Sequence, residues 1–236
     1  MANYLIISAT SSIGQKTVEL LSALGHKLYL TSRDINKLSI FSKYEHASEV
    51  LDASNFLATE QIVINALQNM GSIDGVVNCA GSLLLKPAHL TSEEEFANTI
   101  NASLTTAFST IRAYTKHFQG EGSVVLISSA ASLIGLSNHE AIASAKAAIN
   151  GLVLSAAATY APRIRINAVA PGLVETSLTE KITSNAASRN FSEKMHALGR
   201  LGQTTDIAKA IIFLLENSWI TGQILAVDGG LSSIRK

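Results

Sequence analysis

The strongest constraint on the fold is an alternation of short apolar runs with longer segments of helical periodicity along all 236 residues. Apolar runs bounded by turn residues are typical of strands covered on both faces, as parallel strands are. Strands are expected at 4–8, 27–31, 47–52, 73–78, 123–128, 164–170 and 223–228, and helices near 13–24, 55–70, 92–117, 139–160 and 204–216. This order predicts an α/β fold, a doubly wound parallel seven-stranded sheet between two layers of helices.

Composition favours a compact globular protein. Hydrophobic residues make up 47% of the chain and charged residues 15%, which argues against disorder. Eighteen basic residues balance eighteen acidic ones, so net charge provides no attraction to nucleic acid or to an anionic membrane. We expect residues 1–236 to form a single domain. Its polar, weakly periodic segment 175–203 is expected to be a mobile insertion on the substrate side of the sheet.

The cellular setting is indicated by cysteine content and by the N-terminus. Cys79 is the single cysteine, which excludes an intrachain disulfide and fits a reducing compartment. The first residues lack the basic start and cleavage site of a signal peptide. No run of about 18 apolar residues predicts a membrane span. We therefore expect a soluble cytoplasmic protein with no nucleic-acid partner, no membrane partner and no metal.

The segment "LIISATSSIGQKTVELL" predicts a strand, a tight turn and a helix, the geometry that presents backbone N–H groups to a pyrophosphate. A dinucleotide fingerprint has three glycines in such a turn, and only Gly14 is present, with Ser8 and Ser12 at the other two positions. Where positive φ is needed, serine costs on the order of 1 kcal/mol. The turn therefore predicts a dinucleotide site of weakened affinity; the alternative is an ordinary strand-to-helix turn.

Five later segments resemble the short-chain dehydrogenase/reductase family, close in layout to 3-oxoacyl-carrier-protein reductases. They are "VVNCAG", "TINASL", "VVLISSAAS", "RINAVAPGLVETSL" and "ITGQILAVDGG". The resemblance covers essentially the whole chain and implies a Rossmann fold that binds a nicotinamide dinucleotide. The cofactor-binding residues that it implies are Ser8, Thr10, Ser11, Ser12, Ile13, Gly14, Arg33, Asp52, Asn78, Ala80, Gly81, Lys146, Pro171, Gly172, Val174 and Thr176.

The end of the second expected strand bears on the choice of cofactor. Thr31 and Ser32 are neutral, and Arg33 stands where the 2′-phosphate of NADP would lie. A guanidinium offers a planar fork of donors suited to phosphate, so NADP is favoured over NAD. The alternative is a solvated Arg33 paired with Asp34. The second basic residue of the family's NADP-binding members is absent, because Ser11 occupies its position.

The resemblance assigns catalytic roles to Asn101, Ser129 and Lys146, and it exposes one departure from the family. Four residues before Lys146, where the family has a catalytic tyrosine, this chain has Ile142, which cannot donate a proton. His139 shares a helical face with Ile142 and Lys146, so it is a candidate proton donor. The alternatives are that His139 belongs to a helix start capped by Asn138, or that a bound water donates the proton. The alternative for Ser129 is tight packing beside the cofactor, and for Asn101 a hydrogen bond to local backbone. The alternative for Lys146 is a solvent-facing position on the helix.

Two functions follow as hypotheses. The first is an NADP-dependent oxidoreductase acting on a small carbonyl or alcohol with an altered proton donor. The second is a dinucleotide-binding sensor or scaffold with little or no turnover. In the resembling family the long helices and the last strand make subunit contacts, which predicts a homodimer or homotetramer. Apolar residues that would line a substrate pocket are Leu178, Ile182, Phe191 and Met195.

Overall fold

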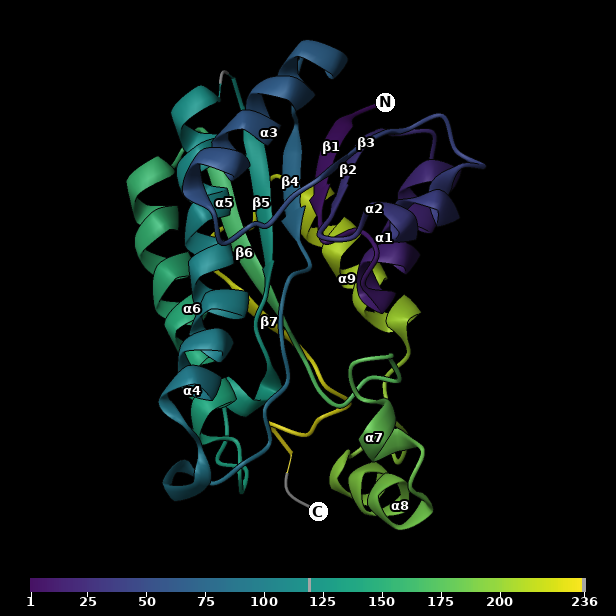
Figure 1. Cartoon of the computed structure of the whole chain (residues 1–236), viewed down its shortest axis with the longest axis vertical. Helices are drawn as coiled ribbons and strands as arrows, with labels where there is room; N and C mark the ends of the chain where they lie inside the picture. The colour runs from purple at the N-terminus through teal and green to yellow at the C-terminus, as the bar shows by residue number, and fades with distance from the viewer. Residues whose placement is uncertain (119, 235–236) are drawn as a thin grey trace.

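The computed structural model describes residues 1–118 and 120–234 (Figure 1). Its sheet is parallel throughout, in the order β3-β2-β1-β4-β5-β6-β7. The strands are β1 (Asn3–Ile7), β2 (Lys27–Ser32), β3 (Ala47–Val50), β4 (Gly75–Asn78), β5 (Gly122–Ile127), β6 (Ile164–Pro171) and β7 (Ile224–Val227). The direction of winding reverses between β1 and β4, and ligands of doubly wound sheets bind beyond the carboxyl ends at such a point. The predicted fold class is confirmed.

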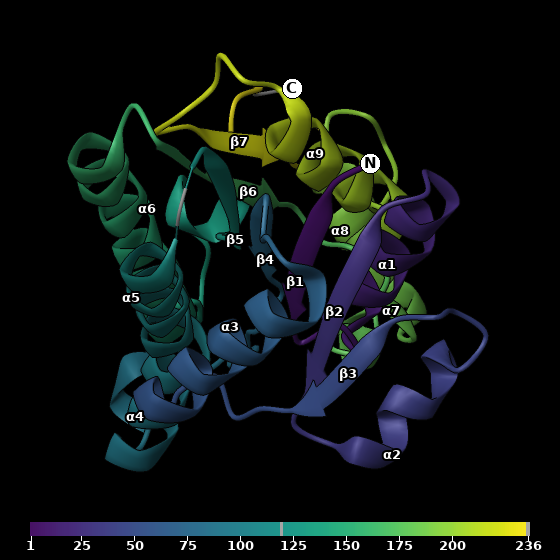
Figure 2. The same cartoon turned by 90° about the horizontal axis from the view of Figure 1, so that it is seen from above.

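Helices cover both faces of this sheet (Figure 2). They are α1 (Ser12–Ala23), α2 (Ile35–Leu38), α3 (Phe56–Met70), α4 (Glu93–Ile100), α5 (Thr106–His117), α6 (Glu140–Tyr160), α7 (Glu180–Thr183), α8 (Ala186–Met195) and α9 (Thr204–Glu216). α1 and α9 pack together on one face, whereas α3, α5 and α6 pack on the other. Each face therefore has its own apolar core.

The valine pairs of the central strands show why these runs form strands. Val76 and Val124 are buried in the core under α3, α5 and α6, and their neighbours Val77 and Val125 are buried in the core under α1 and α9. Side chains of a strand alternate between its faces, so a strand covered on both sides is apolar at successive positions.

The helix expected over 92–117 is interrupted. Ser92 and Glu95 form a capping box that starts α4, and residues Asn101–Thr105 then form a π-helical stretch before α5 begins. A π-helical stretch in an α-helix is frequently found at a functional site. The interruption begins at Asn101, to which the resemblance assigns a catalytic role.

Residues 175–203 contain α7 and α8, which lie beyond the carboxyl ends of the strands and apart from the sheet (Figure 1). The Asn185 side chain caps α8 by accepting a hydrogen bond from the Ser188 N–H. Arg189 bonds the carboxylates of Glu175 and Glu193, which ties α8 to the segment that follows β6. This insertion has a helical structure that its weak periodicity did not predict.

Within the described residues, α6 is the one helix long and apolar enough to cross a bilayer by length and composition. Its inner face is packed into the core: Ile149 and Val153 are buried there with residues of the sheet. Lys146 and Asn150 lie in the middle of the helix. α6 is therefore a core helix of this fold.

Candidate active site

The turn between β1 and α1 leads directly into a capped helix N-terminus. Ser8 has a φ of 57°, in the left-handed region that favours glycine. Ser11 caps α1, and its hydroxyl oxygen accepts from the Gly14 N–H at 3.1 Å. A Cβ on Gly14 would lie 2.7 Å from the carbonyl oxygens of Ser8 and Ala9, so only glycine allows α1 this close to β1. One serine of this turn, Ser8, thus has a backbone conformation that favours glycine, and the close approach of α1 to β1 at Gly14 requires glycine.

Ser12 links this turn to the segment that follows β6. Its hydroxyl oxygen accepts a hydrogen bond from the Ser177 N–H at 3.2 Å, and the two hydroxyls lie 3.2 Å apart. The sequence carried no signal for Ser177, because the two residues are 165 positions apart. The structure thus brings the first turn and the Pro171–Thr176 segment to one side of the sheet's carboxyl edge.

The end of β2 places a cation beside the turn. The Ser32 hydroxyl is buried and lies 2.8 Å from the Thr10 hydroxyl, and the next residue, Arg33, is exposed. No ion pair between Arg33 and Asp34 occurs in the part of the chain that the structure describes. Instead Asp34 caps α2 by accepting from the Asn36 N–H at 3.0 Å. Arg33 is therefore available to an anion.

Asp52 follows β3 and is held by a neighbour. One of its carboxylate oxygens accepts from the Ser54 N–H at 3.0 Å and from the Ser54 hydroxyl at 2.7 Å. These bonds lower the pKa of Asp52, and the charge of Arg33 lowers it further. Asp52 is consequently an ionised acceptor on the same side of the fold as Arg33.

The loop after β4 is fixed from within. The Asn78 amide donates to the Thr110 hydroxyl at 2.9 Å, and its carbonyl accepts from the Ala80 N–H at 2.8 Å. Burial raises the pKa of the adjacent Cys79 thiol to about 12. The Ser82 hydroxyl is buried without a hydrogen-bond partner among the described residues. Asn78 thus shapes the loop, while Ser82 offers an unused polar atom beside it.

Lys146 lies at the centre of the site, between the ends of β4 and β5. Its side chain is buried, and Nζ donates to the carbonyl oxygen of Ile127 at 2.7 Å. A Cβ on Gly81 would be 3.4 Å from Nζ. Burial lowers the pKa of Lys146 to about 8, and the Cys79 thiol opposes this shift. Burying a charged ammonium group here reduces the free energy of unfolding. A buried group with a shifted pKa is also a candidate for ligand binding or proton transfer.

Ser129 is held close to α6 by a polar network around its neighbours. Its own hydroxyl oxygen accepts from the Ala131 N–H at 3.1 Å, which caps the short helix Ala130–Ser132. The Ser128 hydroxyl donates to Asn150 at 2.6 Å, and the Asn150 amide donates to Ser132 at 2.9 Å. Asn150 was missed at the sequence level, where a polar residue in an otherwise apolar helix was the available signal.

Ile142 and His139 lie at the start of α6. Ile142 is 3% exposed, so the position of the family's tyrosine is an apolar, buried one. His139 occupies the N-cap without a capping side chain, and its Nδ1 lies 2.7 Å from the Ser137 carbonyl oxygen. The interpretation of Asn138 as the N-cap was therefore wrong: Asn138 has a φ of 63° in the turn before the helix. Asn101 accepts from the Thr105 hydroxyl within the π-helical stretch.

The segment after β6 is held by a histidine that sequence reasoning missed. His196 is buried, its Nε2 accepts from the Leu173 N–H at 3.2 Å, and its Nδ1 lies 2.6 Å from the Ser192 carbonyl oxygen. Because Nε2 accepts and Nδ1 faces a carbonyl oxygen, the Nδ1–H is the ring's donor. A Cβ on Gly172 would lie 2.7 Å from Nε2. His196 therefore positions the backbone of Gly172 and Leu173.

The remaining residues predicted for the site lie on the same elements. Ile13 and Gly14 are in the first turn of α1, Pro171 ends β6, Val174 is bridged to Gly202, and the Thr176 N–H donates to the Thr179 hydroxyl. The described residues contain no group of three or more His, Cys, Asp or Glu that could hold a metal. The site thus offers a helix N-terminus, hydroxyls, an exposed guanidinium and one buried ammonium group.

Comparisons with known proteins agree with this geometry. The profile of the family described as Enoyl-(Acyl carrier protein) reductase matches residues 7–232. The chain is 33% identical over 244 residues to 3-oxoacyl-[acyl-carrier-protein] reductase FabG of Thermotoga maritima, covering 96% of each chain. It is 30% identical over 236 residues to carbonyl reductase family member 4 of Danio rerio, again covering 96% of each.

Solved structures extend the likeness to three dimensions. ElxO with NADP bound superposes with a TM-score of 0.90 at 31% identity, over 99% of each chain. A gluconate 5-dehydrogenase from Burkholderia cenocepacia, in complex with NADP and tartrate, superposes with a TM-score of 0.94 at 25% identity, over 99% of this chain and 96% of that one.

Proposed function

Because the chain belongs to the short-chain dehydrogenase/reductase family, we propose that it is an NADP-dependent oxidoreductase acting on a small carbonyl or alcohol substrate. The main support for this proposal is that the ammonium group of Lys146 is buried without a carboxylate partner in the part of the chain that the structure describes. A buried ammonium group costs several kcal/mol unless it is paired, and no carboxylate pairs with Lys146 among the described residues. Such a group at the carboxyl ends of β4 and β5 is explained by a ligand.

The described residues fit a dinucleotide. The turn at Ser8–Gly14 would present the N-terminus of α1 to a pyrophosphate, and the exposed Arg33 would meet the 2′-phosphate of NADP. Asp52 would lie near the adenine, and the backbone of the loop after Asn78 would line the groove. The segment from Pro171 to Thr176, which His196 positions, would hold the nicotinamide. When bound, the dinucleotide supplies or accepts a hydride.

Side chains of the protein would then hydrogen-bond the substrate oxygen and protonate it. The Ser129 hydroxyl would donate a hydrogen bond to this oxygen, and Lys146 would bind the nicotinamide ribose. Asn101 lies in the π-helical stretch that packs against α6. Hydride addition to a carbonyl places negative charge on oxygen, which needs a proton and hydrogen-bond donors. The proton donor is altered, because Ile142 replaces the tyrosine.

Binding and turnover are tested separately. We expect NADPH to quench Trp219 fluorescence and raise the melting temperature, and we expect NADPH oxidation with at least one member of a panel of small carbonyl compounds. Binding without turnover on any carbonyl would support the second candidate, a dinucleotide-binding sensor or scaffold, which the buried Ile142 favours. Absence of binding would contradict both functions.

Cofactor choice is tested at Arg33. Charge-assisted hydrogen bonds contribute about 1.5–3 kcal/mol, so Arg33→Ala should weaken NADPH binding roughly ten- to hundredfold and leave NADH binding unchanged. Lys37→Ala removes another exposed cation from the adjoining helix α2 and serves as the matched control. An equal loss of NADPH affinity in both variants would contradict a specific contact of Arg33 with the phosphate.

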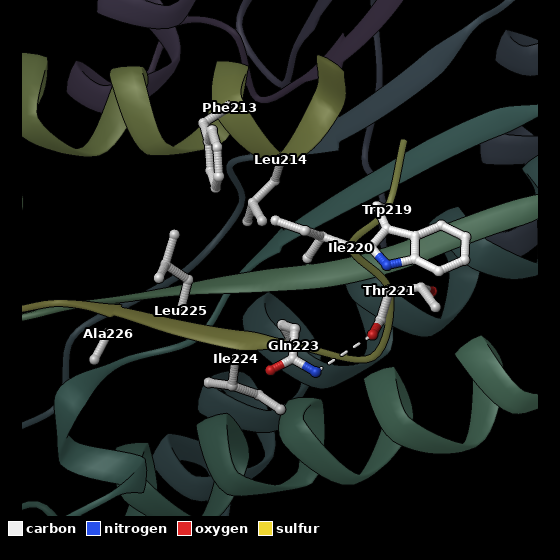
Figure 3. Close-up of a pocket in the computed structure, with 9 residues that line it drawn as sticks. All are labelled: Phe213, Leu214, Trp219, Ile220, Thr221, Gln223, Ile224, Leu225 and Ala226. Atoms are coloured by element: carbon white, nitrogen blue, oxygen red, sulfur yellow. Dashed lines mark hydrogen bonds between the residues drawn. The ribbon is translucent and has the colours of Figure 1, made fainter. Parts of the chain in front are cut away.

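We also propose that the chain forms one cytoplasmic domain over residues 1–236 and assembles as a homodimer or homotetramer. β7 is an edge strand of the sheet. A hollow beside it is lined by apolar side chains that include Phe213, Trp219 and Leu225 (Figure 3). The Trp219 side chain is 96% exposed. A second copy of the chain pairing along β7 would cover this edge.

A further inference from the structure

The proton donor must come from the titratable side chains on the elements around Ile142 and Ser129. His196 uses both ring nitrogens in hydrogen bonds to neighbouring backbone, so neither nitrogen is free to contact a substrate oxygen. His139 lies at the N-cap of α6 with its Nδ1 on the Ser137 carbonyl. The Cys79 thiol is buried, and its raised pKa makes it a poor acid. Lys146 is the remaining titratable group at the carboxyl ends of β4 and β5.

We propose that Lys146 itself donates the proton to the substrate oxygen during carbonyl reduction, an inference that rests on the proposed oxidoreductase function. In the family that this chain resembles, the lysine assists a tyrosine. Here the tyrosine's position, one helical turn before Lys146, holds Ile142, so the ammonium group is a buried donor one turn further along that face of α6.

The contacts of Lys146 leave it free to act. An ammonium group has three N–H donors, and one of them is used by the Ile127 carbonyl oxygen at 2.7 Å. No second hydrogen-bond acceptor contacts Nζ among the described residues. Nζ also lies beside Gly81, where the absence of a side chain keeps space open. Two N–H groups therefore remain for ligand oxygens.

The surroundings favour proton release near neutral pH. Burial is the main influence on Lys146 and lowers its pKa to about 8, while the Cys79 thiol acts in the opposite direction. Other charged groups on the elements around it are otherwise placed or engaged: Glu95 of α4 pairs with Lys86, and Glu140 lies exposed in the first turn of α6. An acid whose pKa lies near the working pH transfers protons efficiently in both directions.

In the proposed step, the carbonyl carbon would accept the hydride that a reduced nicotinamide supplies. The π electron pair of the C=O bond would move to the oxygen, and the oxygen would take a proton from Nζ. The N–H bond breaks, an O–H bond forms, and Lys146 is left as a neutral amine. It regains its proton from solvent. The carbonyl compound is reduced to the alcohol and the nicotinamide is oxidised.

The first experiment measures Lys146 without cofactor or turnover. The pH dependence of its modification by an amine-reactive acylating reagent, followed by mass spectrometry, should show a titration near pH 8. Exposed lysines such as Lys209 provide the reference in the same sample. Titration of Lys146 together with these exposed lysines would overturn the proposal.

The second experiment follows kcat for carbonyl reduction against pH at saturating NADPH. For the wild type we expect a plateau below about pH 8 and a tenfold fall per pH unit above it, because only the ammonium form donates. Lys146→Met should lower kcat by about a hundredfold or more, and Lys146→Arg should remove the break near pH 8. Lys209→Met should leave both kcat and the break unchanged.

The outcomes separate the two levels of the hypothesis. A break that persists in Lys146→Arg, or one that is lost in His139→Gln, would overturn the role of Lys146 and leave the oxidoreductase function standing. The role of Lys146 as proton donor would also be overturned if weaker NADPH binding fully explained the loss of activity in Lys146→Met. Lys146 would then only bind the cofactor. Absence of carbonyl reduction at every pH would overturn the proposed function and this inference together.

Discussion

At the scale of single residues, Ser8 combines a serine side chain with a φ of 57°, a conformation that favours glycine. Ser8→Gly should be more stable than Ser8→Ala by about 1 kcal/mol, because alanine keeps the left-handed strain and glycine does not. Ser8→Gly should also bind NADPH more tightly, since the backbone can approach the pyrophosphate. Urea unfolding and fluorescence titration of both variants measure this. Equal stability of the two variants would show that the strain is negligible.

Lys146 also makes a pH-dependent contribution to stability. Its pKa falls from 10.5 to about 8 on folding, so between these values the unfolded chain binds more protons and the free energy of unfolding rises with pH. Below pH 8 the buried charge destabilises the fold by about 3 kcal/mol. Lys146→Met should therefore raise the free energy of unfolding at pH 7. The gain should be smaller by about 1 kcal/mol than the cost of the buried charge, because the Ile127 carbonyl loses its hydrogen-bond donor. The gain should shrink at pH 10; a pH-independent gain would contradict burial as its cause.

The sequence predicted single residues best where chemistry and position are local. Lys146, Ser129 and Gly14 stand on the elements where they were expected. His196 and Ser177 were missed because each acts on a segment far away in sequence, through contacts that no local pattern encodes. Their bonds form only once the chain after β6 folds back over the sheet.

At the scale of elements, the packing of α1 on β1 depends on Gly14. A methyl group there would meet two backbone carbonyl oxygens at 2.7 Å, and backbone cannot yield as a flexible side chain does. Gly14→Ala should destabilise the protein by about 1–3 kcal/mol. Gly151→Ala is the matched control, because nothing lies within 4 Å of its added methyl on α6, and it should stabilise by up to about 1 kcal/mol. Thermal unfolding of both variants tests this, and similar melting temperatures would contradict the packing argument.

Regular elements were predictable where burial imposes a period. All seven strands and the long helices lie close to their predicted ranges, because each packs apolar residues against one of the two cores. α7 and α8 contain no fully buried residue, so no apolar stripe marked them. The π-helical stretch at Asn101 could not be predicted from the sequence either, because an extra residue in one helical turn leaves the composition of the helix unchanged. The candidate site lies against these less predictable elements.

At the scale of the whole molecule, the two edges of the sheet differ. β3 is a four-residue strand in which Ser48 and Val50 are exposed, and its Glu49 carboxylate bonds Tyr29 and Asn65. β7, at the other edge, adjoins the exposed ring of Trp219 and the half-exposed ring of Phe213. An apolar, unpaired edge is a template for another strand. The β7 edge is therefore the one expected to join copies of the chain.

Trp219 makes this assembly directly measurable, because it is the only tryptophan in the chain. In an isolated chain Trp219 is 96% exposed, whereas a second copy along β7 would remove its ring from water. On dilution through the dissociation range, its emission should shift to longer wavelength as the mass from light scattering falls towards 24.9 kDa. Trp219→Asp should dissociate the assembly at concentrations where Leu24→Lys, which alters an exposed leucine at the end of α1, leaves it intact. An assembled Trp219→Asp variant with wild-type mass would place the interface elsewhere on the molecule, and a monomeric wild type would exclude it altogether.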